Sequence, residues 1–162
     1  MDLRHRLPEL LPLAIAWAEA EASRGLAEGV PLDAAALALA GRVGVRDPQR
    51  IRVIRVHEMP APGDPLLRQA TREAGLSGPN SAGLTLGHAI FLRSDDQRPQ
   101  LLAHECRHVA QYESFGSIGA FLRSYLADVI RVGYRASLLE RDARAFENAF
   151  LDPADATFEP TA

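Results

Sequence analysis

Several features are scarce in this chain, and each shortage excludes a class of protein. Cys106 is the only cysteine among 162 residues, so the chain forms no internal disulfide and has no cysteine cluster for a metal ion. Long apolar runs are also missing. The apolar run 10–18 is short and contains Pro12. These features favour a core helix at roughly 9–24 and argue against a signal peptide or a membrane span. We therefore expect no membrane partner and a reducing, cytoplasmic location.

An excess of positive charge is absent as well. The formal net charge is -3, although 18 residues are basic and all of them are arginine. Arg50, Arg52 and Arg55 alternate with apolar residues, which is typical of a half-exposed strand and not of a phosphate-binding patch. The composition therefore predicts no nucleic-acid partner.

One motif stands out from the rest of the sequence. His104, Glu105 and His108 form a His-Glu-x-x-His pattern inside the predicted helix 97–114. On a helix, side chains four residues apart lie on one face about 5–6 Å from each other, so both imidazoles can reach one metal ion. Glu105 adds a carboxylate that can take a proton from metal-activated water. The alternative is a surface helix with incidental histidines.

The rest of this helix predicts a buried position. Its apolar residues recur at helical spacing on a face distinct from the histidines, namely Leu102, Cys106, Val109 and Ala110. Pro99 suits the first turn, and Asp95 or Asp96 is expected to cap the helix start. Cys106 is interpreted as a small core residue, because the helix geometry does not favour an exposed catalytic thiolate.

A catalytic zinc site usually has three protein ligands and one open position, so the motif needs a third donor. A later predicted helix carries Glu140, Ala143 and Glu147 on one face, and the small Ala143 would allow close packing against the motif helix. We predict Glu140 as the third ligand. Glu147 is the competing ligand, and Glu113 is too near His108 in sequence to fold back easily. In the alternative interpretation, Glu140 belongs to a solvated, charged helix face.

The motif and the pattern Glu-x-x-Ala, which begins at Glu140, 32 residues after the last histidine, resemble the gluzincin or thermolysin-like branch of zinc metallopeptidases. The flanking residues also resemble small bacterial proteins with this motif. The resemblance covers roughly 83–150. It implies a Zn2+ ion held by His104, His108 and Glu140. It also implies that Glu105 is the general base in the hydrolysis of a peptide or protein substrate.

One position departs from the pattern of that group. Thermolysin-like enzymes commonly carry an aspartate four residues after the ligand glutamate, where it orients a zinc histidine, but this chain has Arg144 there. Asp142 is expected on a different face of the helix. The departure sustains an alternative function, a metal-binding but catalytically inactive relative that acts as an interaction module.

The residues 84–93, just before the motif, are rich in β-formers and predict a strand. In the resembled families an edge strand at this place pairs with extended substrate through main-chain hydrogen bonds. Gly87 would permit close backbone approach, and His88 could contact substrate or be structural. A strand without any substrate role is the alternative.

Peptide hydrolysis also needs a hydrogen-bond donor for the negatively charged oxygen of its tetrahedral intermediate. Tyr134 is the first candidate, because Gly133 could break a helix and allow a loop to aim the tyrosine hydroxyl at the cleft. Tyr112, on the histidine face, is the second candidate and Arg144 the third. Each of the three also suits a packing or surface role.

The length and the 47% share of hydrophobic residues suit one domain with a real core. We expect this domain to cover 1–151 and to have a mostly helical α+β, zincin-like fold, with a small sheet whose edge strand flanks the motif helix. The segment 152–162 is predicted to be a mobile tail. The predicted helices are 9–24, 32–42, 65–74, 97–114, 117–131 and 136–149, and the predicted strands are 50–57 and 84–93.

Overall fold

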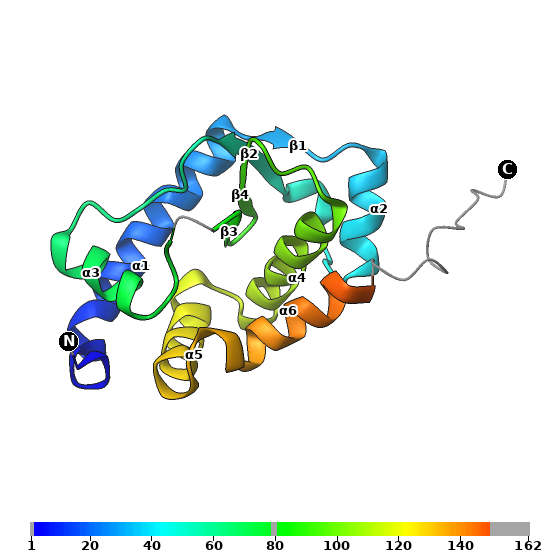
Figure 1. The fold of residues 1–162 in the computed structure, drawn as a ribbon. Helices are drawn as coiled ribbons and strands as arrows, with labels where there is room; N and C mark the ends of the chain where they lie inside the picture. The colour runs from blue at the N-terminus through cyan, green and yellow to red at the C-terminus, as the bar shows by residue number, and fades with distance from the viewer. Residues whose placement is uncertain (1, 79–80, 150–162) are drawn as a thin grey trace, which may run out of the picture.

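The computed structural model describes residues 2–78 and 81–149, and these residues have the α+β architecture expected from the sequence (Figure 1). They form α1 (Leu3–Glu28), β1 (Val30–Pro31), α2 (Ala34–Arg42), η1 (Pro48–Arg50), β2 (Arg52–Val56), α3 (Pro65–Glu73), β3 (Gly83–Leu86), β4 (Ala89–Arg93), α4 (Pro99–Phe115), α5 (Ile118–Val132), η2 (Tyr134–Ala136) and α6 (Leu138–Ala149), where η marks a 3-10 helix. The predicted tail 152–162 lies outside the described residues. The expected likeness to zincin folds stays a prediction.

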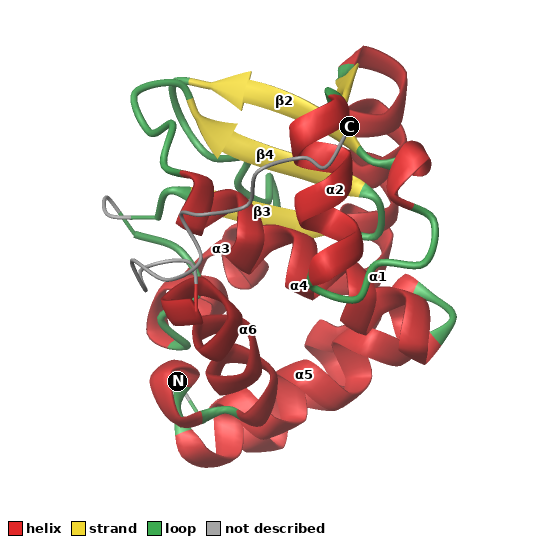
Figure 2. Cartoon of the chain, turned by 90° about the vertical axis from the view of Figure 1, so that its right-hand side faces the viewer, coloured by secondary structure: helices red, strands yellow, loops and turns green. Residues whose placement is uncertain are grey.

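The four strands form one mixed sheet in the order β1-β2-β4-β3 (Figure 2). The central strands β2 and β4 run parallel, whereas β1 pairs antiparallel with β2, and β3 pairs antiparallel with β4. β3 is therefore an edge strand, and it lies next to the motif helix α4. The sequence predicted this placement of the edge strand.

Helices pack on both faces of the sheet. Successive side chains of a strand point to opposite faces, and here both faces carry apolar side chains that the helices cover. Leu92 belongs to a core with Cys106 of α4, whereas its neighbour Phe91 belongs to a second core with α1 and α5. α1 approaches the sheet closely at Gly25, where an added Cβ would lie 2.7 Å from Cβ of Ala89. The motif helix is thus anchored on the opposite side of the sheet from α1.

The single strand predicted over 84–93 is wrong, because the segment forms a hairpin of β3 and β4. Leu86 pairs with Ala89, which leaves Gly87 and His88 as a two-residue turn. Gly87 has φ +64°, a conformation that favours glycine and that such turns use. Gly87 therefore reverses the chain, and the expected role in close substrate approach does not apply to it.

α1 is longer than the predicted 9–24. Its N-cap residue Asp2 accepts backbone hydrogen bonds from Arg4 and His5. Pro8 and Pro12 lie inside the helix, although Pro12 was expected near its first turn. Each proline removes one helical hydrogen bond, and the helix persists because a row of its apolar side chains is buried.

Pro99 lies in the first turn of α4 as expected, although the helix begins at this residue and not at 97, and the predicted capping by an aspartate is wrong. Arg98 is the N-cap residue, and its side chain makes no capping hydrogen bond. Asp96 instead accepts hydrogen bonds from the backbone N–H and the guanidinium of Arg98. The carboxylate is therefore engaged one residue before the helix.

α6 packs along α4 and brings the second half of the predicted site to the motif (Figure 1). Ala143 of α6 is fully buried, in keeping with the close packing of the two helices that its small size predicted. Gly133 ends α5 with φ +88°, and Tyr134 follows in η2. Within the described residues, no helix is long and apolar enough to cross a membrane.

Candidate metal centre

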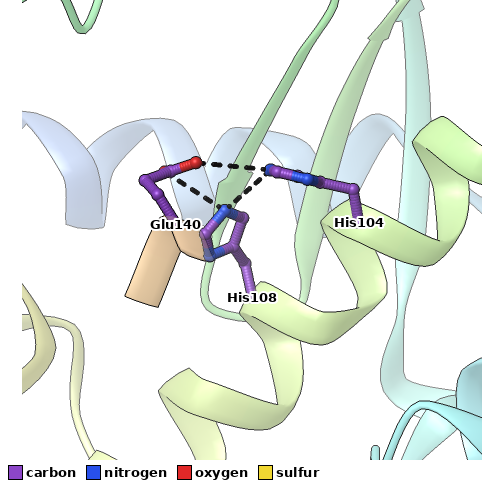
Figure 3. A group of neighbouring side chains, drawn as sticks. All are labelled: His104, His108 and Glu140. Atoms are coloured by element: carbon purple, nitrogen blue, oxygen red, sulfur yellow. Dashed lines mark hydrogen bonds and ion pairs between the residues drawn. The ribbon is translucent and has the colours of Figure 1, made fainter. Parts of the chain in front are cut away.

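The structure brings His104 and His108 of α4 together with Glu140 of α6 (Figure 3). The two Nε2 atoms are 3.1 Å apart, and the carboxylate of Glu140 lies 3.5 Å from Nε2 of His104 and 3.3 Å from Nε2 of His108. A tetrahedral zinc site with bonds of about 2.0–2.2 Å separates its ligand atoms by about 3.3–3.6 Å. The three side chains can therefore hold one metal ion with little movement.

One oxygen of this group has no hydrogen-bond partner. Glu140 is 2% exposed, and its Oε1 accepts a hydrogen bond of 2.7 Å from the hydroxyl of Tyr125. Its Oε2 is the one buried side-chain nitrogen or oxygen without a partner in the part of the chain that the structure describes. An unpaired buried carboxylate oxygen is costly, and a cation bound there would satisfy it. The two-nitrogen, one-oxygen donor set suits zinc and related divalent metals.

Opposing influences set the charges in this group. Burial alone would raise the pKa of Glu140, but its close contacts with the imidazoles of His104 and His108 and the hydrogen bond from Tyr125 hold it far below its usual range. For His104, burial alone would lower the pKa. The negative charges of Glu140 and two further carboxylates have the larger effect, so the pKa of His104 is raised. Glu140 is therefore ionised at neutral pH. A metal ion must compete with a proton for His104.

Each histidine has a partner on the ring nitrogen that faces away from Glu140. Nδ1 of His104 lies 3.1 Å from Oε2 of Glu147, and Nδ1 of His108 lies 2.8 Å from Oε1 of Gln111. Such partners fix the tautomer that leaves Nε2 free for a metal. Glu147, considered above as a competing ligand, therefore occupies the outer side of His104.

Gln111 is itself held in one orientation. Its amide nitrogen donates hydrogen bonds to the backbone oxygen of Leu139 (3.0 Å) and to Oδ2 of Asp142 (2.8 Å), so its oxygen must face His108. Arg107 clamps the same Asp142 at 2.7 Å. Asp142 does not touch a histidine, as expected from its helix face, but it reaches the centre through Gln111.

Glu105 lies beside the metal-binding group and is positioned by the edge strand. Its Oε2 accepts a hydrogen bond of 2.7 Å from the hydroxyl of Thr85. At Gly83, an added Cβ would lie 2.2 Å from Oε1 of Glu105, so the carboxylate occupies the space that any larger residue would need. The sequence predicted the carboxylate and did not predict this support from β3.

The metal-binding group and Glu105 line one cleft of about 740 Å³, bounded by β3, α1, α3, α5 and η2. The pairing of β3 with β4 leaves alternate backbone groups of β3 pointing toward the unpaired edge. The backbone N–H of Arg93 donates a hydrogen bond to the backbone oxygen of Ala82, so Ala82 points toward β4. Because the direction alternates along an antiparallel strand, the backbone groups of Gly83 and Thr85 point toward the unpaired edge. Much of the wall is apolar and includes Trp17, Leu84, Leu86, Phe121, Leu122 and Leu126.

The structure separates the three candidates for stabilising an oxyanion. Tyr134 lines the cleft, and burial, aided by the charge of Glu140, raises its pKa, so its hydroxyl stays protonated and can donate. Tyr112 also lines the cleft and stacks on Phe121 with ring centres 3.7 Å apart. Arg144 does not line the cleft and sits 3.6 Å from Oε2 of Glu140. Tyr134 thus keeps its place as the first candidate, and the prediction for Arg144 loses its geometric basis.

Three other residues considered above lie away from the metal-binding group. Glu113 bonds to His88 at 2.9 Å near the far end of α4 and has no part in the group. Cys106 is fully buried, and burial raises the pKa of its thiol to about 12, so it is an unreactive core residue.

Sequence reasoning missed two side chains that support the group. Gln111 follows His108 by three residues, and that helical spacing could have revealed it. Tyr125 comes from α5, and no local pattern links it to Glu140.

Comparison of the chain with protein-family models, with curated proteins and with solved structures gave no match. Neither a family nor a related fold therefore assigns a function. The geometry of the metal-binding group and its cleft carries the functional argument.

Proposed function

We propose that this protein is a zinc-dependent peptidase. The observation that carries the proposal is the carboxylate of Glu140 inside a cleft: Oε1 lies near Nε2 of His108, and Oε2 lies near Nε2 of His104 and has no hydrogen-bond partner. A purely structural cluster would be expected to satisfy this oxygen with a donor. A divalent cation at this place satisfies it and leaves one coordination position for the reaction.

In this proposal His104, His108 and Glu140 hold the metal. Bound zinc supplies Lewis acidity toward a carbonyl group and activates water. Glu105 takes the proton of the attacking water, and Thr85 holds the Glu105 carboxylate in place.

The substrate is a peptide, because the cleft runs along the unpaired edge of β3. Gly83 and Thr85 offer outward backbone groups to an extended chain, and such pairing tolerates varied side chains. Tyr134 donates a hydrogen bond to the oxygen that becomes negative during hydrolysis.

A metal-binding protein without catalysis is the second candidate function. It is favoured by Arg144, which stands where thermolysin-like enzymes commonly carry an aspartate that orients a zinc histidine, and whose guanidinium lies 3.6 Å from Oε2 of Glu140. Glu105 weighs against it, because Thr85 and the space at Gly83 hold this carboxylate beside the metal-binding group, where a general base is needed.

The Glu105→Gln variant distinguishes the two functions. We expect it to keep zinc at the wild-type stoichiometry and to lose cleavage of a peptide library by about 10²–10⁴-fold, because a general base is removed without loss of a ligand. Glu19→Gln, at an exposed site on α1, is the matched control. If the zinc-loaded wild type cleaves no peptide, or the Glu105→Gln variant cleaves as fast as wild type, the peptidase proposal fails.

A further inference from the structure

The α3 side of the cleft carries two arginines. Arg68 and Arg72 are four residues apart on α3, so they share a helix face, and both line the cleft that contains the metal-binding group. Both also line a shallow depression of about 370 Å³, which places them at the rim. A ligand that extends from the metal-binding group toward α3 therefore meets two guanidinium groups.

Neither arginine has an acidic partner among the described residues. Arg68 donates a hydrogen bond of 2.8 Å to the neutral backbone oxygen of Gly63, and no ion pair or hydrogen bond engages the side chain of Arg72. Other surface arginines do have acidic partners in their own helix, as Arg24 has with Glu21 and Glu28. The charge of the α3 pair thus remains available to a ligand.

The surroundings strengthen the field of this pair. Of the described carboxylates that line the cleft, Glu58 is the only one besides Glu105 and Glu140. Apolar side chains form much of the wall between the two ends of the cleft, and low-dielectric walls focus the field of charged groups into a cleft. A guanidinium fork matches the geometry of a carboxylate and can bind it through two parallel hydrogen bonds.

We propose that Arg68 and Arg72 form a carboxylate-binding subsite at the α3 end of the cleft. A peptide substrate would place there either an acidic side chain or its free C-terminal carboxylate. The identification of the ligand as a peptide rests on the proposed function. The subsite itself rests on the unpaired charges and their shared cleft.

Binding of labelled peptides tests the subsite without requiring cleavage. The protein is the zinc-loaded full chain carrying Glu105→Gln, which prevents turnover. The probes are three N-terminally labelled hexapeptides with the same apolar centre, ending in a free carboxylate, in an amide, or in an amide preceded by glutamate. Fluorescence anisotropy gives the dissociation constants at low and at high salt. The comparison is repeated with Arg68→Gln and Arg72→Gln combined, and with Arg123→Gln as a control at an exposed position outside the cleft.

We expect at least one carboxylate peptide to bind about 5–20-fold more tightly than the neutral peptide at low salt, and less so at high salt. The double variant should abolish this preference, and Arg123→Gln should leave it intact. The peptide that shows the preference tells whether the subsite takes a side chain or the chain end. Equal binding of all three peptides, or a preference that survives the double variant, would overturn the proposal.

The outcome for the subsite is separate from that for the peptidase. A charge preference that depends on Arg68 and Arg72 supports the subsite even if the wild type cleaves nothing. Conversely, cleavage with equal binding of charged and neutral peptides supports the peptidase and removes the subsite.

Discussion

The side chains of Glu113 and Glu140 are both almost fully buried and each faces a histidine, but they differ in how completely their oxygens are hydrogen bonded. Near the C-terminal end of α4, Glu113 accepts backbone hydrogen bonds from Arg46 (2.7 Å) and Asp47 (3.1 Å) and faces Nε2 of His88 at 2.9 Å. Its pKa is lowered, because these donors outweigh the effect of burial. This cluster ties the hairpin turn and the loop before η1 to the helix.

The second buried glutamate, Glu140, faces His104 and His108 and keeps one oxygen without a donor. Both environments contain histidine and a buried carboxylate, so composition does not distinguish them. The completeness of hydrogen bonding does. A carboxylate with a full set of donors fastens the fold, whereas one with a missing partner marks a place for a ligand.

Removal of a histidine from each cluster gives the largest expected contrast. His108→Ala removes one of three metal-binding groups and should abolish stoichiometric zinc binding, whereas His88→Ala should leave the zinc content unchanged. Elemental analysis after dialysis against a weak chelator measures both. If the His108→Ala protein retains full zinc occupancy, the ligand assignment is wrong.

The outer partner of His108 should have a smaller effect. Gln111→Ala removes the acceptor at Nδ1 and leaves Nε2 in place, so zinc affinity should fall by about 10–100-fold. Chelator competition gives the affinity, and Gln49→Ala, at an exposed position, is the control. An unchanged zinc affinity of Gln111→Ala would show that the hydrogen-bond network of Arg107, Asp142 and Gln111 does not influence metal binding.

The motif helix was predictable because it depends on short-range spacing, whereas Glu140 was proposed from its helix face and from the resemblance to a known ligand pattern. His104 and His108 share a helix face by their separation alone, and Glu140 was recognised beside the small, buried Ala143. Tyr125 was not predictable, because its bond to Glu140 depends on how α5 crosses α6. Likewise, no local pattern indicates that Gly83 makes room for the carboxylate of Glu105, 22 residues later in the chain.

The hairpin shows a different reason for an error. The run 84–93 is rich in β-formers throughout, so the propensity of its residues concealed the reversal. Gly87 was the signal, since a glycine inside a strand pattern is also a turn residue with positive φ. The fold class was therefore within reach of the sequence, whereas strand propensity alone did not divide this run into two strands.

The fully bonded cluster should matter for stability and not for metal. Glu113→Gln replaces an ionised acceptor with an amide, and we expect the free energy of unfolding to fall by about 1–3 kcal/mol, because buried donors lose a charged partner. Urea denaturation measures this change, and zinc content should stay at the wild-type value. A loss of zinc without a loss of stability would reverse the roles assigned to the two glutamates.

The stabilisation that Glu113 provides should depend on pH. The pKa of Glu113 is lowered in the folded protein from an ordinary value of 4.5, so its stabilisation is fully present above that pH and is lost as the pH falls through the folded-state pKa. The difference in stability between wild type and Glu113→Gln should therefore shrink in acid. A difference that stays constant from neutral pH to pH 3 would contradict this account.

The central claim is that a metal ion binds at Oε2 of Glu140, the oxygen that has no hydrogen-bond partner. The most direct measurement is a crystal structure of the zinc-loaded protein with anomalous data collected at the zinc absorption edge. We predict one peak at about 2.0–2.2 Å from Nε2 of His104, Nε2 of His108 and Oε2 of Glu140. No peak among these three atoms, or a peak at the fully bonded Glu113 and His88 instead, would contradict the account.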